Sequence, residues 1–183
     1  MKQIEFNTEK LKAEEVEAVT KKVRALVINK HTQKALLVRY AGLYMLPGGS
    51  VDEGETEVET LKREVLEEAG IEITEEQLRP YLLINSYDRN YVDRKKGTIN
   101  RLTKTIFYEV STDKEMDETK KNLTESEKEN NYTIEYTNLS VMHYLIETNK
   151  TDNPKRKQFD REILTALNEF AQMKEIDKNE RER

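Results

Sequence analysis

The chain has no cysteine and no tryptophan. The absence of cysteine excludes a disulfide scaffold, a zinc site built from thiolates and a cysteine nucleophile. Only two histidines, His31 and His143, are available for imidazole chemistry. Glycine and proline are also scarce, with six and three residues among 183. This composition excludes collagen-like, proline-rich and glycine-rich linker chains.

The sequence also lacks long apolar runs and an excess of basic residues. Its longest aliphatic stretches, such as 25–28 and 35–38, have about four residues, whereas a bilayer span needs about 20. Residues 1–10 lack the apolar segment of a signal peptide. With 31 basic and 36 acidic residues the net charge is −5, so no nucleic-acid polymer is expected as a partner. We expect a cytoplasmic protein with no membrane partner.

The length fits one domain, which we place at residues 1–174. Residues 111–131 hold seven acidic residues and four lysines but only Met116 and Leu123 as apolar side chains. This composition predicts a mobile surface excursion. The charged end at 175–183 is expected to fray.

The spacing of the apolar residues predicts both strands and helices along the chain. Residues 23–28 and 35–40 predict a hairpin with its turn at 29–33, and 88–100 predict a basic connection that includes Arg94, Lys95 and Lys96. Further strands are predicted at 4–6, 82–87, 102–110 and 132–136, and helices at 56–69, 139–146 and 159–170. The helix at 159–170 is amphipathic and starts shortly after Pro154.

Five of the six glycines lie within residues 42–70, around the strongest helix signal. Thr56 and Glu59 have the spacing of a capping box, and Gly70 suits the left-handed position that ends a helix. Between them an apolar stripe recurs at helical spacing, formed by Val58, Leu61, Val65 and Ala69.

Three carboxylates share one side of this predicted helix, because residues three and four apart are neighbours: Glu64, Glu67 and Glu68. Their mutual repulsion costs some tenths of a kcal/mol per pair, and Arg63 offsets only part of it. A hard divalent cation would offset all of it, and oxygen ligands without cysteine favour Mg²⁺ or Mn²⁺. The alternative is a solvated acidic face on a structural or interaction protein.

The glycines and carboxylates together resemble a complete Nudix box, preceded by the family's usual lead-in of Leu46, Pro47 and Gly48. The matching positions are Gly49, Glu55, Arg63, Glu64, Val65, Glu67, Glu68, Gly70 and Ile71. The resemblance implies an α/β fold, a Nudix-type α/β/α sandwich around a mixed sheet, here with a C-terminal amphipathic helix.

The resemblance also implies a Mg²⁺-dependent hydrolase, with Mn²⁺ as a substitute. It would cleave a pyrophosphate bond in a nucleoside diphosphate linked to another moiety. The implied metal ligands are Glu55, Glu64, Glu67, Glu68 and the carbonyl of Gly48 or Gly49. Arg63 would orient the glutamates. The general base stays open between Glu64, Glu67 and a later glutamate among Glu125, Glu127 and Glu129. A non-catalytic nucleotide-binding or regulatory module of the same fold is the alternative function.

The substrate is less well defined by the sequence. Arg24 and Arg39 are candidates for phosphate binding, as are Arg89 and Arg101. Tyr87 lies sixteen residues after Ile71, a spacing that in the family accompanies dinucleoside polyphosphate hydrolases. The predicted helices at 139–146 and 159–170 could pack on the core or form a homodimer seam. We expect a small phosphorylated, nucleotide-like substrate.

Overall fold

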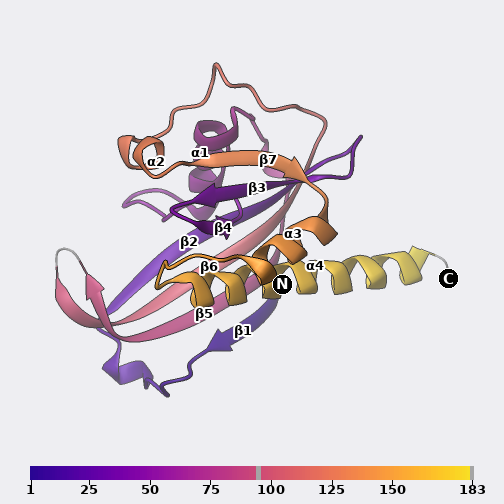
Figure 1. Ribbon diagram of the computed structural model, residues 1–183. Helices are drawn as coiled ribbons and strands as arrows, with labels where there is room; N and C mark the ends of the chain where they lie inside the picture. The colour runs from indigo at the N-terminus through magenta and orange to yellow at the C-terminus, as the bar shows by residue number, and fades with distance from the viewer. Residues whose placement is uncertain (94–95, 182–183) are drawn as a thin grey trace.

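The structure is a computed structural model that describes residues 1–93 and 96–181 (Figure 1). Arg94 and Lys95 of the expected basic connection, and the last two residues of the expected frayed tail, lie outside the described residues. The strands are β1 (Lys2–Phe6), β2 (Ala18–Asn29), β3 (Ala35–Tyr40), β4 (Leu43–Met45), β5 (Leu78–Asp93), β6 (Gly97–Thr112) and β7 (Thr133–Thr137). The helices are α1 (Glu57–Ala69), α2 (Glu125–Glu129), α3 (Leu139–Thr148) and α4 (Arg156–Arg181), with short 3₁₀ turns at Ala13–Glu15 and Glu75–Gln77.

The described strands form one mixed sheet of seven strands in the order β1-β5-β6-β2-β3-β4, with β7 paired to β3. β1 runs parallel to β5 and β2 runs parallel to β6, whereas the other pairs are antiparallel. The predicted α/β class with a mixed sheet and a C-terminal helix is therefore confirmed.

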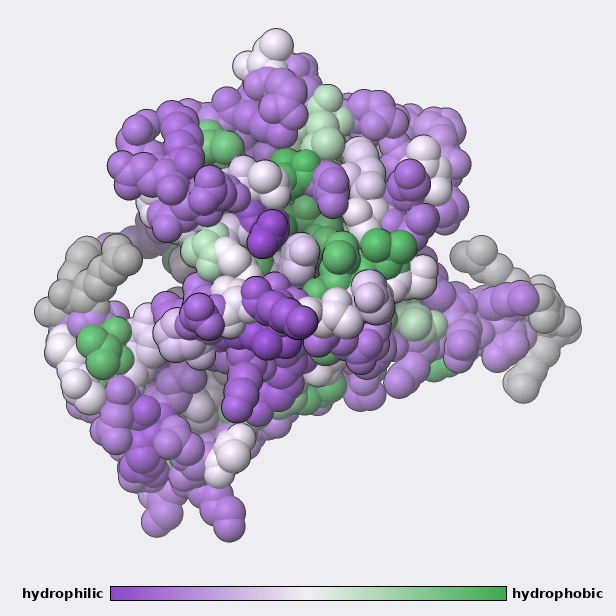
Figure 2. All heavy atoms as spheres, in the orientation of Figure 1, coloured by the Kyte–Doolittle hydropathy of each residue, from purple (hydrophilic) through white to green (hydrophobic). Residues whose placement is uncertain are grey.

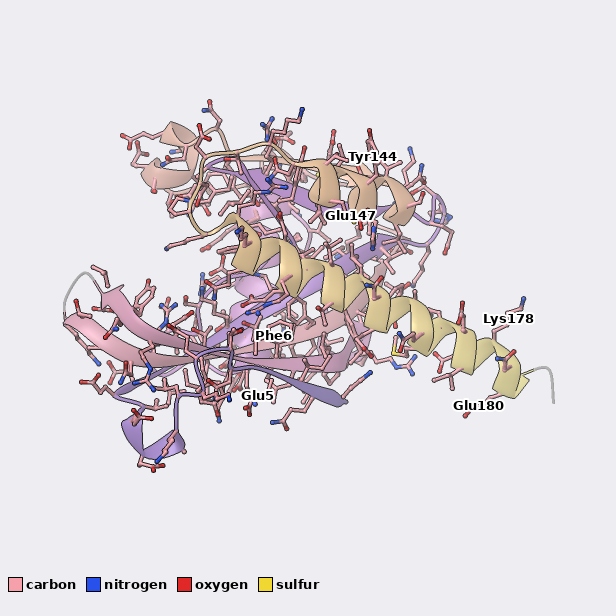
Figure 3. The ribbon with its side chains drawn as sticks, turned by 60° about the horizontal axis from the view of Figure 1, so that its bottom comes forward. Glu5, Phe6, Tyr144, Glu147, Lys178 and Glu180 are labelled. Atoms are coloured by element: carbon pink, nitrogen blue, oxygen red, sulfur yellow. The ribbon has the colours of Figure 1, made fainter. Side chains whose placement is uncertain are left out.

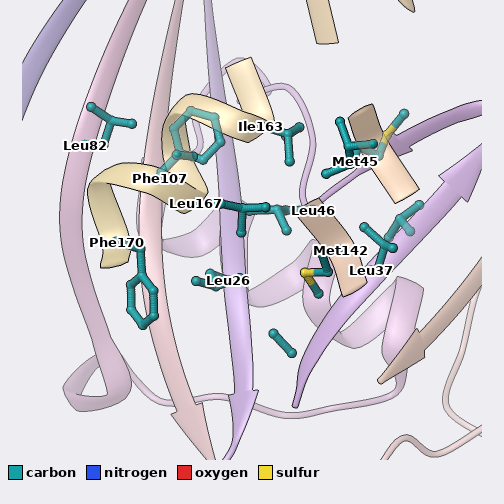
Figure 4. Close-up of a cluster of buried hydrophobic side chains, with 14 of the residues drawn as sticks. Leu26, Leu37, Met45, Leu46, Leu82, Phe107, Met142, Ile163, Leu167 and Phe170 are labelled. Atoms are coloured by element: carbon teal, nitrogen blue, oxygen red, sulfur yellow. The ribbon is translucent and has the colours of Figure 1, made fainter. Parts of the chain in front are cut away.

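Helices cover both faces of the sheet, because alternate side chains of β2 point to opposite layers. Val23, Ala25 and Val27 pack with Leu61 and the rest of the apolar stripe of α1. Leu26 and Ile28 belong to the second core, which lies under α3 and α4. Figure 4 shows this second core, in which Phe107 and Leu82 of the sheet meet Ile163, Leu167 and Phe170 of α4.

The predicted hairpin forms between β2 and β3, but the two strands pair only at Ile28 and Ala35. Beyond that point the segment 47–51 lies along β2 in place of β3. The amide of Ala25 donates to the carbonyl of Pro47 at 2.8 Å, and the amide of Val23 donates to the carbonyl of Gly49 at 3.0 Å. The glycine-bearing loop is thereby fixed to the edge of a central strand.

Both ends of α1 are formed as predicted. The Thr56 hydroxyl accepts from the amide of Glu59 at 3.2 Å, and the Glu59 carboxylate accepts from the amide of Thr56 at 2.8 Å. Gly70 has φ +69°, and its amide donates to the carbonyl of Leu66. The box therefore consists of a loop held on β2 and a helix with defined limits.

Residues 111–131 pack against the end of α1. The amide of Asp117 donates to the carbonyl of Ala69 at 3.1 Å, and the amide of Asn122 donates to the carbonyl of Glu67 at 2.8 Å. Met116 packs against the core under α1. The mobility of this excursion stays a prediction, since these contacts describe one arrangement only.

The C-terminal helix is longer than the predicted 159–170 and continues to Arg181. Figures 1 and 3 show its last turns, which carry Lys178 and Glu180, projecting beyond the sheet. Two ion pairs connect the C-terminal half of α4 to the sheet. Arg79 of β5 pairs with Asp177 at 2.8 Å, and Glu109 of β6 pairs with Lys174. Fraying of 175–181 stays a prediction.

The face drawn in Figure 2 is mostly hydrophilic, with hydrophobic side chains gathered near its middle, around α3. On α3 itself Val141 and Tyr144 are 43% and 64% exposed. The homodimer predicted through α3 and α4 stays a prediction. None of the described helices has an apolar stretch long enough to cross a membrane.

Candidate active site

Two glycines, Gly48 and Gly49, allow the loop before α1 to pack closely against both β2 and α1. Gly48 has φ +131°, and a Cβ there would lie 2.2 Å from the carbonyl oxygen of Val23. A Cβ at Gly49 would lie 2.2 Å from Oε1 of Glu64. The first glycine therefore lets the backbone approach the sheet, and the second lets it approach a carboxylate of α1.

Arg63 lies at the centre of the carboxylate cluster. Its Nε and Nη2 donate to the two oxygens of Glu55 at 2.9 and 3.0 Å, a bidentate pair. Its Nη1 donates to Glu64 at 3.0 Å and to Glu67 at 3.1 Å. These are the contacts that an orienting arginine would make, and the role itself stays a prediction.

The environment of Glu55 stabilises its charged form. The hydrogen bonds from Arg63 and then from the Thr60 hydroxyl lower the pKa of Glu55 to about 2. Glu55 is therefore ionised across the whole physiological pH range. Its pair with Arg63 joins the loop before α1 to the middle of that helix.

Glu68 is the most buried of the four glutamates, with 5% of the residue exposed. Its Oε2 accepts from the amide of Gly48 at 2.9 Å, which ties α1 to the loop. Burial raises the pKa of Glu68 to about 8, although Arg24 and this amide act in the opposite direction. Burial also raises the pKa of Glu64, against the opposing charge of Arg63.

Tyr132 and Glu127 reach this cluster from the segment after β6. Burial, followed by the charges of Glu68 and Glu127, raises the pKa of the Tyr132 phenol. Glu127 caps α2, because its carboxylate accepts from the amide and the hydroxyl of Thr124 at 2.6 and 2.8 Å. Glu125 pairs with Lys128, and Glu129 is exposed. Of the three later glutamates, Glu127 is thus the one whose charge acts on the cluster.

Arg24 of β2 lies on the other side of the loop. Its Nη1 donates to the carbonyl of Leu46 at 3.0 Å and also to the carbonyl of Gly48. Its positive charge acts on Glu64 and Glu68. The structure therefore brings this predicted substrate-binding residue to the box, and a carbonyl oxygen that accepts one hydrogen bond keeps a second lone pair for another partner.

Two further substrate-binding candidates, Arg39 and Tyr87, lie elsewhere. Arg39 is opposite Thr133 of β7 and borders a separate cavity. Tyr87 is on β5 opposite Leu102, and β6 separates it from β2. Within residues 1–93 and 96–181 no hydrogen bond or ion pair connects either side chain to the glutamates, so their role in binding stays a prediction without a supporting contact.

The donor set suits a hard divalent cation. No three acidic or histidine side chains of the described chain are already arranged around one point as a metal cage, since Arg63 lies among them. However, all candidate ligands are oxygens, and Gly49 leaves free the space that a Cβ would fill beside Glu64. Burial disfavours the negative charges of Glu64 and Glu68, and a cation would offset that cost.

Sequence reasoning missed two residues of this region. Tyr132 was treated only as part of a strand, and no local signal connects it to Glu68. Lys22 was overlooked, although the alternation of β2 places Lys22 and Arg24 on the face of Leu26 and Ile28. Basic residues are rare on the buried face of a strand, so Lys22 and Arg24 at two such positions could have predicted a functional pocket.

Comparisons with known proteins identify the family and the fold. The family model described as the NUDIX domain matches residues 19–130. No curated protein sequence matches the chain. Solved structures of similar fold include a C. elegans Ap4A hydrolase binary complex, with 19% identity, a TM-score of 0.50 and coverage of 84% of this chain and 96% of that one.

Two further structures are similar at lower TM-scores. The E. coli dihydroneopterin triphosphate pyrophosphohydrolase has 16% identity, a TM-score of 0.49 and coverage of 80% and 95%. The NUDIX domain of Shewanella oneidensis NrtR, complexed with ADP ribose, has 18% identity, a TM-score of 0.48 and coverage of 74% and 82%. At these identities the likeness concerns the fold.

Proposed function

Because the chain belongs to the Nudix domain family and is an enzyme of the pyrophosphohydrolase type, we propose that it is Mg²⁺-dependent, with Mn²⁺ as a substitute. Its substrate is a nucleoside diphosphate linked to another moiety, cleaved at the phosphoanhydride. The observation that carries the proposal is the position of Glu64 and Glu68 against the backbone of Gly48 and Gly49.

The ion would be held by Glu64, Glu67, Glu68 and the Gly48 carbonyl, with Glu55 in support. When bound, it would neutralise phosphate charge and lower the pKa of a coordinated water. The buried position of Glu68 excludes water from one side of this set. The second lone pair of the Gly48 carbonyl supplies a neutral ligand.

Arg63 positions the carboxylates. Its bidentate pair with Glu55 fixes the guanidinium plane, and Nη1 then spaces Glu64 and Glu67. One of these two glutamates accepts the proton of the attacking water. Glu127 is the weaker candidate for this step, because its carboxylate is engaged in the cap of α2.

The test is a phosphate-release screen with Mg²⁺ over nucleoside triphosphates, dinucleoside polyphosphates, ADP-ribose and nucleotide sugars. We expect hydrolysis of at least one class and its loss in EDTA. Glu67→Gln should lower kcat/KM by about 100-fold or more, which is the usual contribution of a general base or a metal ligand. Glu53→Gln, an exposed position of the same loop, is the matched control and should keep full activity.

Full activity of Glu67→Gln in the presence of EDTA would contradict the proposal. Tight nucleotide binding without turnover in either Mg²⁺ or Mn²⁺ would instead identify a regulatory module. Comparison of Glu64→Gln with Glu67→Gln separates the proton acceptor from a pure ligand, because loss of a ligand raises the Mg²⁺ concentration needed for activity, whereas loss of the acceptor lowers kcat at saturating Mg²⁺.

A further inference from the structure

A second polar cavity lies on the face of the sheet opposite α1, between β2, β6 and the start of α4. Its volume is about 60 Å³. Four basic side chains, Lys22, Arg24, Arg101 and Lys155, contribute to its lining. Since one water needs roughly 10–15 Å³, the cavity holds about four to six water-sized atoms, which suits one phosphoryl group.

The cavity lies next to an apolar stretch of the same face. Towards the ends of β2 and β6 this face carries Leu26, Ile28 and Phe107, all in the core under α4. Towards their beginnings it carries Lys22 opposite Thr105. A buried cation is costly unless it is paired, so a polar patch at a position that could hold core residues calls for a ligand.

Lys22 lacks such a partner in the part of the chain that the structure describes. Its ammonium makes no hydrogen bond or ion pair with any residue that the structure describes. Burial, and then the neighbouring charge of Arg24, lowers the pKa of Lys22 to about 8. Glu162 acts in the opposite direction, whereas Arg101 and Lys155 lower the pKa further. The like-charged groups therefore repel one another across the cavity.

Several hydrogen-bonding atoms in the lining are also unpaired. Thr103 and Thr105 are 3% and 2% exposed, and neither hydroxyl has a hydrogen-bond partner among residues 1–93 and 96–181. The Nε of Arg101 is likewise buried without a partner. Buried polar groups normally find partners, so three unpaired ones around a single cavity indicate a missing acceptor.

The acidic groups nearby are already engaged. Asp88 accepts from Arg101 at 2.8 Å, and Glu162 accepts from the hydroxyl of Ser86 at 2.8 Å. Arg24 donates only to neutral carbonyl groups among its recorded partners. Glu162 keeps its negative charge, because a hydroxyl is neutral, so the lining has a positive balance of Lys22, Arg24 and Lys155 against this one carboxylate.

We propose that this cavity binds a second phosphoryl group of the substrate, remote from the bond that is cleaved. Arg24 supports the connection, because it borders the cavity and also holds the carbonyls of the box loop. The inference rests on the proposed function, and it narrows the substrate to molecules that carry a phosphoryl group in addition to the reacting anhydride.

Binding of inorganic tripolyphosphate in EDTA tests the cavity without the glutamate site. Calorimetry of the full chain should detect binding at millimolar concentration. Lys22→Met should weaken it about tenfold, which corresponds to ~1.4 kcal/mol. Lys104→Met is the matched control, because it removes the same charge from an exposed position on β6 and should bind as the unmodified protein does. Lys155→Ala, at the exposed residue that precedes α4, serves if Lys22→Met fails to fold.

Absence of binding by the unmodified protein, or equal binding by Lys22→Met and Lys104→Met, would overturn the proposal. Two results separate it from the proposed function. Loss of tripolyphosphate binding in Lys22→Met without hydrolysis of any substrate supports the cavity but not the enzyme. Hydrolysis with the same KM in Lys22→Met and the unmodified protein supports the enzyme but not the cavity.

Discussion

At Gly49 the backbone lies so close to Glu64 that no side chain fits between them. An alanine Cβ would lie 2.2 Å from Oε1, the far end of a flexible side chain, so Glu64 can move aside. We predict that Gly49→Ala folds normally, with a stability loss below about 1 kcal/mol. It should bind Mn²⁺ about tenfold more weakly, measured by calorimetry beside thermal unfolding. Ser50→Ala is the control, and unchanged Mn²⁺ affinity in Gly49→Ala would contradict the role of this contact.

Gly48 differs from Gly49, because its Cβ would meet the backbone of Val23 and its φ of +131° already disfavours other residues. Gly48→Ala should therefore weaken the fold itself, at a cost on the order of 1–3 kcal/mol for the strained backbone. Two adjacent glycines of one motif thus have separate tasks, the first in folding and the second in the site.

Among the elements, α1 carries the carboxylates, so its first turn matters for the site. Thr56→Ala removes the hydroxyl that accepts from the amide of Glu59. We predict a loss of about 1 kcal/mol, the usual value for such a cap. This is a fall in Tm of roughly 2–4 °C for a chain of this size, measured by calorimetry. Thr124→Ala removes the same type of cap from the exposed, five-residue α2 and should cost less than half as much. Equal losses in the two variants would contradict this ranking.

The apolar pattern of the sequence did not predict the full length of the two long strands, β5 and β6. β5 and β6 each have sixteen residues, whereas the apolar pattern predicted 82–87 and 102–110. The extensions are mostly polar, and cross-strand partners stabilise them, as Asp88 and Arg101 do at 2.8 Å. The pattern predicts burial, but pairing with a neighbouring strand also satisfies the backbone of exposed residues.

At the scale of the whole molecule, the half-buried Lys22 connects folding to pH. Its pKa is about 8 in the folded chain, against 10.5 for an exposed lysine. Below pH 8 the residue is charged in both states, so the burial cost is fully present. Between about pH 8 and 10.5 the folded chain releases the proton and the unfolded chain keeps it, so this cost falls as pH rises.

Lys22→Met removes that cost. We predict that it is more stable than the unmodified protein at pH 7, by roughly 2–4 kcal/mol. The difference should shrink by pH 9.5 in urea unfolding, because the unmodified protein recovers stability there. A difference that is the same at both pH values would contradict the burial of a charged Lys22.

Local spacing alone was enough to predict the carboxylate helix, its two ends and the glycine loop, because all of these depend on residues within a few helical turns. The family was predicted from the resemblance of this segment to a known motif. The chain needs no distant contact to place Glu64, Glu67 and Glu68 on one side of α1. Only the tertiary structure could place Glu68 on the Gly48 amide, bring Tyr132 and Glu127 beside it and enclose Lys22 beneath α4. Those contacts join segments far apart in the sequence, and the order of strands in the sheet decides which of them meet.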